Sequence, residues 1–275
     1  MLQSSDVRTQ HRIEPGADMS EILSLRNCSM HFGGLKAVSE FDFSLCPGEL
    51  AGLIGPNGAG KTTVFNMITG VCAPTLGEIH FAGSRIDALP TYRIASLGVA
   101  RTFQATRLFK GLTVLDNVRT ACHLHCHSSI SGAVLRTTHY LRDEGRISAI
   151  ALKQLETFGL LELKDNIASM LPYGLQRRVE IARALASEPS LLLLDEPAAG
   201  MNPQETEDLM KLIRWVRDEF KLTILLIEHD MRVVMGVCER IAVLDHGVKI
   251  AEGRPDEIKR DPKVIEAYLG DEVVC

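Results

Sequence analysis

A glycine-rich segment in the first quarter of the chain has the residue types needed to hold a phosphate. Residues 55–62 match the pattern Gly-x-x-x-x-Gly-Lys-Thr, after the apolar stretch Leu50–Ile54 and before a helix expected at Val64–Thr69. The glycines let the backbone curl so that successive N–H groups point at phosphate oxygens, and the helix N-terminus adds a partial positive charge. About one chain in a hundred of this length would match by chance. The order strand, glycine loop, helix lowers that number further, so the pattern predicts a nucleotide site.

The positions within this segment have different expected roles. The ammonium group of Lys61 places a positive charge at the β- and γ-phosphates, and the hydroxyl of Thr62 is a ligand for Mg²⁺. We therefore predict that the chain binds ATP with Mg²⁺. The predicted nucleotide contacts in this loop are Gly55, Asn57, Gly58, Ala59, Gly60, Lys61, Thr62 and Thr63.

A second candidate site lies where an apolar stretch ends in two carboxylates. Leu191–Leu194 reads as a buried strand, and Asp195 and Glu196 follow it directly. Taken alone, this pattern is more often a buried strand with a polar end. Together with the phosphate loop, it predicts that Asp195 holds Mg²⁺ through water and that Glu196 orients and polarises the attacking water. Open α/β sheets bind their ligands at the carboxyl ends of strands, where both residues lie.

The elements that must position these residues alternate between strands and helices. Apolar strand-length stretches at 191–194, 223–227 and 241–244 are separated by segments of helical periodicity, which predicts an α/β core with a parallel sheet. Residues 22–32 and 37–45 read as two earlier strands joined by a turn at 33–34. The stretch from about 113 to 170 reads as mainly helical, with a loop or frayed helix at 128–146.

Further motifs, in the right order along about residues 21–270, resemble those of the ABC ATPases. Gln104 matches the Q-loop glutamine that senses Mg²⁺ and the γ-phosphate, and His229 matches the switch histidine. Phe32 falls where the family stacks an aromatic residue on adenine. Singly, such residues are usually surface or core positions, and their spacing from the phosphate loop carries the resemblance. It implies catalytic roles for Glu196, His229 and Lys61, and Mg²⁺ ligation by Thr62, Gln104 and Asp195.

The segment 171–185 lies where the family carries its LSGGQ signature and the following helix. In the family this segment caps the ATP held by the opposite subunit. Relative to that pattern, Pro172 replaces serine, Tyr173 replaces the first glycine, Leu175 replaces glutamine, and Gly174 is kept. The serine hydroxyl contact to the γ-phosphate is therefore lost. A helix that begins near Pro172 still supplies backbone N–H groups and a dipole.

The serine-less signature resembles the branch of the family that serves branched-chain amino-acid uptake. The chain is similar to the LivG-type ATP-binding subunits of bacterial importers, and related branches that move urea, other amides or aromatic acids look alike. Four further segments support that branch: 32–37, 101–104, 194–203 and 264–270.

The resemblance also implies a fold and an assembly. The fold is a P-loop NTPase core with a parallel sheet, an N-terminal antiparallel β subdomain and an inserted helical subdomain at about 113–186. Two ATPase subunits, identical or related, would form a dimer that drives transmembrane permease subunits and, indirectly, a solute-binding protein. The chain would then lie as a peripheral protein on the cytoplasmic face of the inner membrane.

Two other function classes, the non-transport ABC ATPases and the P-loop kinases or GTPases, fit the sequence less well. Non-transport ABC ATPases of DNA repair carry long coiled coils between the phosphate loop and the signature, whereas this interval spans only 61–171 without sustained heptads. Non-transport ABC ATPases that act in translation join two ATPase units in one chain, whereas this sequence shows one. A P-loop kinase or GTPase would not explain the signature helix or the switch histidine.

Composition limits the partners and the compartment. The net charge of −5 gives no sign of a nucleic-acid surface, and no apolar run approaches the length of a membrane span. Residues 1–20 are polar, unlike a secretory signal, and are predicted to be a disordered extension before the ATPase domain at 21–270 and a tail at 271–275. Seven scattered cysteines favour reduced, cytosolic thiols.

A Cys-His-Leu-His-Cys-His run at 122–127 has the residue types of a zinc site. In a helix, Cys122 and Cys126 would form one pair at a spacing of four, and His123 and His127 another. The two pairs would lie about 100° apart around the helix, so the four side chains could not easily meet at one ion. A variable helix surface is therefore the favoured interpretation.

Overall fold

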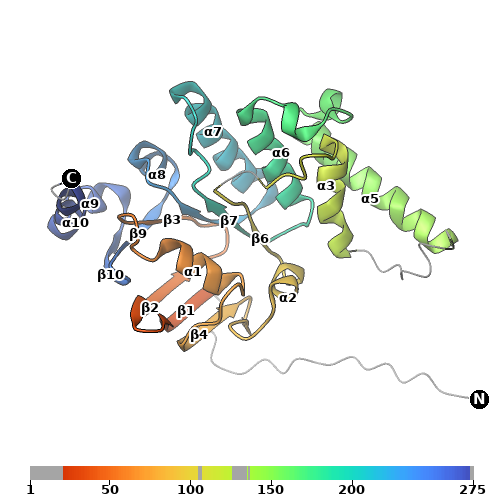
Figure 1. The fold of residues 1–275 in the computed structure, drawn as a ribbon. Coiled ribbons are helices and arrows are strands. Elements are labelled where there is room, and N and C mark those ends of the chain that lie inside the picture. Colours follow the sequence, from red (N-terminus) through yellow and green to blue (C-terminus); the bar gives the residue numbers. More distant parts are fainter. Residues whose placement is uncertain (1–20, 105–106, 126–134, 136, 273–275) are drawn as a thin grey trace, which may run out of the picture.

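The computed structural model describes residues 21–104, 107–125, 135 and 137–272. Its centre is a six-stranded sheet with the order β10-β9-β3-β8-β7-β6 (Figure 1). Five neighbouring strands are parallel, and β10 at one edge is antiparallel to β9. The strands are β3 (Leu50–Ile54), β6 (Val99–Arg101), β7 (Leu191–Asp195), β8 (Thr223–Ile227), β9 (Arg240–Asp245) and β10 (Val248–Gly253).

The central strands are buried on both faces, which explains why they read as continuous apolar runs rather than alternating ones. Side chains along each strand still alternate between two cores. In β7, Leu192 and Leu194 join a core shared with the helical segment, whereas Leu191 and Leu193 join one shared with the N-terminal strands. The predicted parallel sheet is confirmed, with its strands close to the expected positions.

A second, antiparallel sheet covers one core with the order β2-β1-β4-β5. The turn expected at 33–34 joins its first two strands, and Gly33 adopts a φ of 59° there. The predicted N-terminal antiparallel β region is confirmed. Its elements are β1 (Leu23–Phe32), β2 (Leu35–Leu45), β4 (Leu76–Phe81) and β5 (Ser84–Arg85), accompanied by α1 (Lys61–Ile68) and α2 (Thr91–Ser96).

The other core is covered by the helical segment, which lies beyond β6 at one end of the central sheet (Figure 1). Its elements are α3 (Val114–Cys122), η1 (His123–His125), α5 (Thr138–Thr157), η2 (Leu161–Leu163), η3 (Ala168–Met170) and α6 (Tyr173–Leu185).

The structure decides two local points in this segment. The sequence left a loop or a frayed helix open for 128–146, and residues 138–146 form the first half of α5, whose N-terminus the Thr137 side chain caps by accepting from the Tyr140 N–H. The helix considered for 122–127 ends at Cys122 and continues as the short 3₁₀ turn η1, and residues 126–127 lie outside the described part of the chain.

The C-terminal part adds helices around the remaining strands. Helix α7 (Pro203–Phe220) begins with a reciprocal capping box between Asn202 and Glu205. Helix α8 (Met231–Val237) packs against α7. Figure 1 shows α9 (Pro255–Ile258) and α10 (Pro262–Glu272) beside β10, at the opposite end of the sheet from the helical segment.

The limits of the predicted domains are only partly visible. The extension expected at 1–20 lies outside the described residues, and α10 runs two residues into the tail expected from 271. None of the helices in the described part of the chain is long and apolar enough to cross a membrane. The boundaries at 21, 113, 186 and 270 stay predictions.

Candidate functional site

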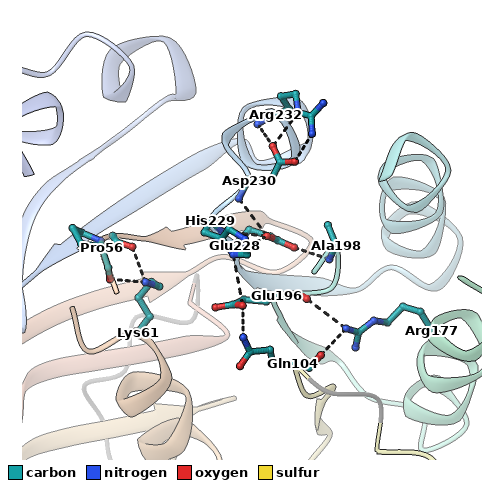
Figure 2. Close-up of polar contacts among 11 residues, drawn as sticks. Pro56, Lys61, Gln104, Arg177, Glu196, Ala198, Glu228, His229, Asp230 and Arg232 are labelled. Atoms are coloured by element: carbon teal, nitrogen blue, oxygen red, sulfur yellow. Dashed lines mark hydrogen bonds and ion pairs between the residues drawn. The ribbon is translucent and has the colours of Figure 1, made fainter. Parts of the chain in front are cut away.

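The chemistry-bearing residues gather at the carboxyl edge of the central sheet, because four of its parallel strands end there. Strand β3 leads into the glycine loop, and β6 leads towards Gln104. Strand β7 ends at Asp195 and is followed directly by Glu196, and β8 is followed directly by Glu228 and His229. Figure 2 shows Lys61, Gln104, Glu196 and His229 around one region.

The glycine loop fits between its neighbours because two of its glycines, Gly55 and Gly60, lack side chains. Gly55 has a φ of 150°, and a Cβ there would lie 2.0 Å from the Leu244 carbonyl oxygen of β9. Gly60, the N-cap of α1, has a φ of 103°, and a Cβ would lie 2.5 Å from the Ala37 carbonyl oxygen. The loop is thus held between β9 and the start of β2, with its backbone close to both.

Lys61 lies across this loop at the first position of α1. Its Nζ donates hydrogen bonds to the carbonyl oxygens of Gly55, at 2.6 Å, and Pro56, at 2.8 Å. The side chain is buried, whereas Asn57, Gly58 and the neighbouring Thr62 are exposed. The ammonium group of Lys61 thus places a buried positive charge at the loop, beside the position expected for a phosphate.

Glu196 is contacted by two of the other predicted site residues. The Nε2 of Gln104 donates to its Oε2 at 2.6 Å, and the Nδ1 of His229 lies 3.6 Å from the same oxygen. The Glu196 backbone has a φ of 44°, a left-handed conformation that costs a non-glycine residue about 1–3 kcal/mol and is common at functional sites. The Glu196 N–H is held by the Ile227 carbonyl at 2.9 Å.

Asp195 forms a buried ion pair that the sequence did not predict. The guanidinium group of Arg101 donates to its Oδ2 at 2.7 Å, and both side chains are less than a tenth exposed. The same guanidinium donates to Asn66 on α1 at 2.8 Å and lies over the rings of Phe65 and Phe103. Arg101 therefore ties β6, β7 and α1 together beneath the phosphate loop.

These residues suit a hard divalent cation. The predicted ligand atoms are the Thr62 hydroxyl, the Gln104 side chain and the Asp195 carboxylate, which supply the oxygen donors that Mg²⁺ prefers. Arg101 donates to Oδ2 of Asp195 and so fixes the orientation of this carboxylate. The donor set fits Mg²⁺, and the assignment of individual ligands stays a prediction.

Glu228, which the sequence reasoning did not single out, is fully buried behind the site. Its carboxylate accepts from the Ala198 N–H at 2.7 Å and from the His229 N–H at 3.1 Å. Burial raises the pKa of this carboxyl, although these N–H groups partly counteract the rise. Glu228 thereby fixes the backbone after Glu196 against the backbone of His229 (Figure 2).

The signature segment begins α6 as expected, with a shift of one position. Pro172 is the N-cap and not part of the first turn, which starts at Tyr173. Leu175 is half-buried and lines a groove of about 210 Å³ between α6 and α7, with Met201 and Leu212 among the other lining residues. The residue that replaces the expected glutamine thus packs towards α7.

Phe32 lies at the end of β1 with its side chain 51% exposed, as a residue that stacks on a ligand would be. Its stacking role stays a prediction. Sequence reasoning missed Arg101, Glu228 and the buried Arg177 of α6. Only Glu228 carried a local signal, because it directly follows the apolar strand Thr223–Ile227.

The Cys-His run does not form a metal site in the part of the chain that the structure describes. No group of three or more potential ligands is found among those residues, and Cys126 and His127 lie outside them. Cys122 is buried, its Sγ donates to the Val118 carbonyl, and burial raises its pKa to about 11. A thiol in this state is a poor metal ligand, since metals bind the thiolate.

Comparison with known proteins agrees with this geometry. A family model described as ABC transporter matches residues 38–199, which is more than half of the chain. The chain belongs to the ABC transporter family. As an ABC ATPase, it hydrolyses ATP. A second model, described as branched-chain amino acid ATP-binding cassette transporter, matches residues 248–274 of this ABC ATPase.

Individual relatives support the assignment along nearly the whole ABC ATPase. It is 46% identical over 250 residues to the high-affinity branched-chain amino acid transport ATP-binding protein LivG of Escherichia coli K12, covering 91% of this chain and 98% of LivG. An ATP-binding cassette solved in its ADP conformation matches with a TM-score of 0.78 and 31% identity, covering 91% of this chain and 99% of that one. A dimeric cassette bound to ADP and phosphate matches with a TM-score of 0.70 and 26% identity, covering 85% and 98%.

Proposed function

We propose that this chain is the ATP-binding subunit that drives the import of branched-chain amino acids. The support is the 46% identity to LivG over 91% of the chain, together with the C-terminal match at 248–274. A motor subunit does not contact the solute, so these similarities and not the site geometry carry the substrate assignment. Import of urea, another amide or an aromatic acid is the alternative that the experiment below separates.

Within the ATP site, each residue has a role that follows from its chemistry. Lys61 exchanges its bonds to the loop carbonyls for bonds to the β- and γ-phosphates. Glu196 accepts a hydrogen bond from the attacking water and polarises it, while Gln104 and His229 hold its carboxylate in place. Thr62, Gln104 and Asp195 would hold Mg²⁺, which would supply positive charge to neutralise the phosphates.

The assembly proposed for this chain is a dimer of ATPase subunits. A dimeric relative bound to ADP and phosphate supports this arrangement. The start of α6, with Pro172 as its N-cap and Tyr173 to Leu175 in its first turn, faces the partner's ATP, and its backbone N–H groups replace the contact of the missing serine. The dimer drives transmembrane permease subunits from the cytoplasmic face of the inner membrane and, through them, serves a solute-binding protein.

The observation that carries the enzymatic part is the position of Glu196. Its carboxylate lies at the carboxyl edge of the sheet, hydrogen-bonded to Gln104 and close to His229.

The decisive test is to express the chain with the permease and binding protein of neighbouring genes and to reconstitute them in vesicles loaded with Mg-ATP. Uptake of labelled leucine, urea and phenylalanine is then measured side by side. We expect ATP-dependent uptake of leucine.

The Glu196→Gln variant is the matched control in these vesicles. It should bind ATP as the wild type does and support neither hydrolysis nor uptake, because an amide cannot accept the proton of the attacking water. Sustained hydrolysis by Glu196→Gln would contradict the role of this carboxylate. Uptake of urea or phenylalanine in preference to leucine would contradict the substrate assignment and leave the ATPase assignment intact.

A further inference from the structure

Arg177 is a fully buried cation in the second turn of α6, close to the predicted ATP site. Its side chain has no exposed surface. Burial of a guanidinium group costs desolvation free energy unless its N–H groups have well-placed acceptors. The acceptors of Arg177 therefore show which segments this residue connects.

The partners of Arg177 come from several segments of the chain. Its terminal nitrogens donate to the carbonyl oxygens of Phe103, at 2.8 Å, and Gln104, at 2.9 Å. One nitrogen also donates to the Tyr173 hydroxyl at 3.1 Å and makes a longer contact of 3.4 Å with the Glu196 carbonyl oxygen. Figure 2 shows Arg177 reaching towards the backbone of both Gln104 and Glu196. The planar fork of arginine suits such divergent acceptors.

The ion pair with Glu180 does not explain this arrangement. Glu180 lies three residues further along the same helix and binds Arg177 at 2.6 Å, so this pair joins α6 only to itself. Glu180 instead neutralises the buried cation, and its other oxygen makes long contacts with the N–H groups of Phe103 and Arg107. Helix α6 thereby holds both the carbonyl and the N–H group of Phe103.

Gln104 consequently connects Glu196 with helix α6. Its side chain bonds to the Glu196 carboxylate, and its carbonyl oxygen bonds to Arg177. Arg177 in turn holds Tyr173, which lies in the first turn of α6. A displacement of Gln104 at one nucleotide is therefore passed through a single buried side chain to the helix turn that would face the other nucleotide.

We propose that Arg177 is a positioning residue that couples Gln104 at a subunit's own ATP to the signature turn presented to the partner's ATP. This inference rests on the proposed function of the two segments. Arg177 touches neither nucleotide, so its loss leaves ATP binding at the phosphate loop intact. The loss of Arg177 instead abolishes the response of the signature turn to ATP binding.

The test measures backbone hydrogen exchange with and without Mg-ATP in the full chain, in a Glu196→Gln background that retains the nucleotide. Two variants are compared, because a buried carboxylate left unpaired could prevent folding. Arg177→Met with Glu180→Gln removes both charges. Arg177→Lys keeps a positive charge near Glu180, but its ammonium cannot hold two carbonyl groups in the same fork. Arg142→Met, at an exposed position of α5, is the control.

In both variants, ATP should still protect peptides from the phosphate loop at 55–63, with affinity within about threefold of the parent. Protection of the signature peptide at 171–178 by ATP should be lost, while the control keeps it. With Glu196 restored, kcat should fall about 10-fold to 100-fold with little change in KM, as expected from misplaced groups.

Full protection of the signature peptide and wild-type kcat in a folded Arg177 variant would overturn the inference. If ATP fails to protect the phosphate loop even in the parent, the proposed function itself is wrong and the inference falls with it. These outcomes are distinguishable, because the phosphate-loop peptide reports the first site and the signature peptide reports the coupling. A folding defect alone would raise exchange in both peptides regardless of ATP.

Discussion

The side-chain amide of Gln104 donates a 2.6 Å hydrogen bond to the carboxylate of Glu196. The two residues lie 92 positions apart in the chain and meet because β6 and β7 are parallel neighbours whose carboxyl ends share one edge. An amide that binds a carboxylate at this distance limits its orientation. Any ligand that draws Gln104 away must release Glu196 at the same time.

Replacing Gln104 with alanine should lower kcat by about 10-fold or more, because Glu196 loses the donor that orients it. The affinity for ATP should change less, since the phosphate loop is untouched. Steady-state ATPase assays together with equilibrium nucleotide binding separate the two effects. Gln204→Ala, at an exposed position of α7, is the control and should keep wild-type values. A variant with normal kcat and weakened binding would contradict the assigned orientation role.

Replacing Arg101 with methionine should destabilise the fold by about 3–5 kcal/mol, because the buried Asp195 carboxylate is left without its partner. A double variant with Asp195→Asn should recover part of that loss, since no buried charge remains. Urea unfolding followed by circular dichroism gives both free energies. An additive result, with no recovery in the double variant, would show that the two side chains do not act as a pair.

Replacing Leu175 with glutamine restores the residue type of the family signature but should not raise turnover. The Leu175 side chain packs in the groove beside α7, so the main effect should be a loss of about 1 kcal/mol of stability from reduced apolar burial. Leu175→Met keeps the apolar volume and serves as the control. A change in kcat beyond about tenfold, with stability unchanged, would place this side chain at the partner's nucleotide instead.

The stability of the chain should decline between pH of about 9 and about 11, in part because of Cys28. Burial raises the pKa of this thiol from 9.0 to about 11 in the folded state. The unfolded chain therefore loses the thiol proton first, and the stability present below pH 9.0 is lost as pH rises towards 11. Each such group can contribute at most about 1.4 kcal/mol per pH unit in this interval.

Urea unfolding of the wild type and of Cys28→Ala at pH 8, 9.5 and 10.5 tests this contribution. The alanine variant should show a shallower decline, because it has no thiol at position 28 to titrate. Replacement of the exposed Cys46 provides the comparison and should leave the decline unchanged. Equal slopes in all three proteins would contradict the raised pKa of Cys28.

Much of the fold could be predicted from the sequence because several local patterns are compatible with only one kind of structure. The apolar run at 191–194 is buried on both faces of a parallel sheet, and its two carboxylates follow where such sheets place ligands. The glycines of the loop at 55–60 were needed for positive φ and close backbone contact. Both features depend on local sequence and on the general geometry of α/β sheets.

Other features depended on contacts that no local pattern specifies. The helical start at 138 follows from a threonine cap within a polar stretch that reads equally well as a loop. Arg101 and Arg177 look like surface charges in the sequence and become buried only when β6, β7 and α6 meet. Leu175 could not be placed for the same reason, since its neighbours in the groove come from another helix.

The packing of the glycine loop also affects the entropy and the heat-capacity change that should accompany nucleotide binding. Gly55 and Gly60 lie against the backbone of β9 and the start of β2, and the Gly247 N–H bonds to the Ala59 carbonyl at 3.0 Å. Most of the conformational entropy of this loop is therefore lost during folding rather than on binding. Phosphate recognition becomes mainly an exchange of hydrogen-bond partners, with little chain ordering and a correspondingly small change in heat capacity.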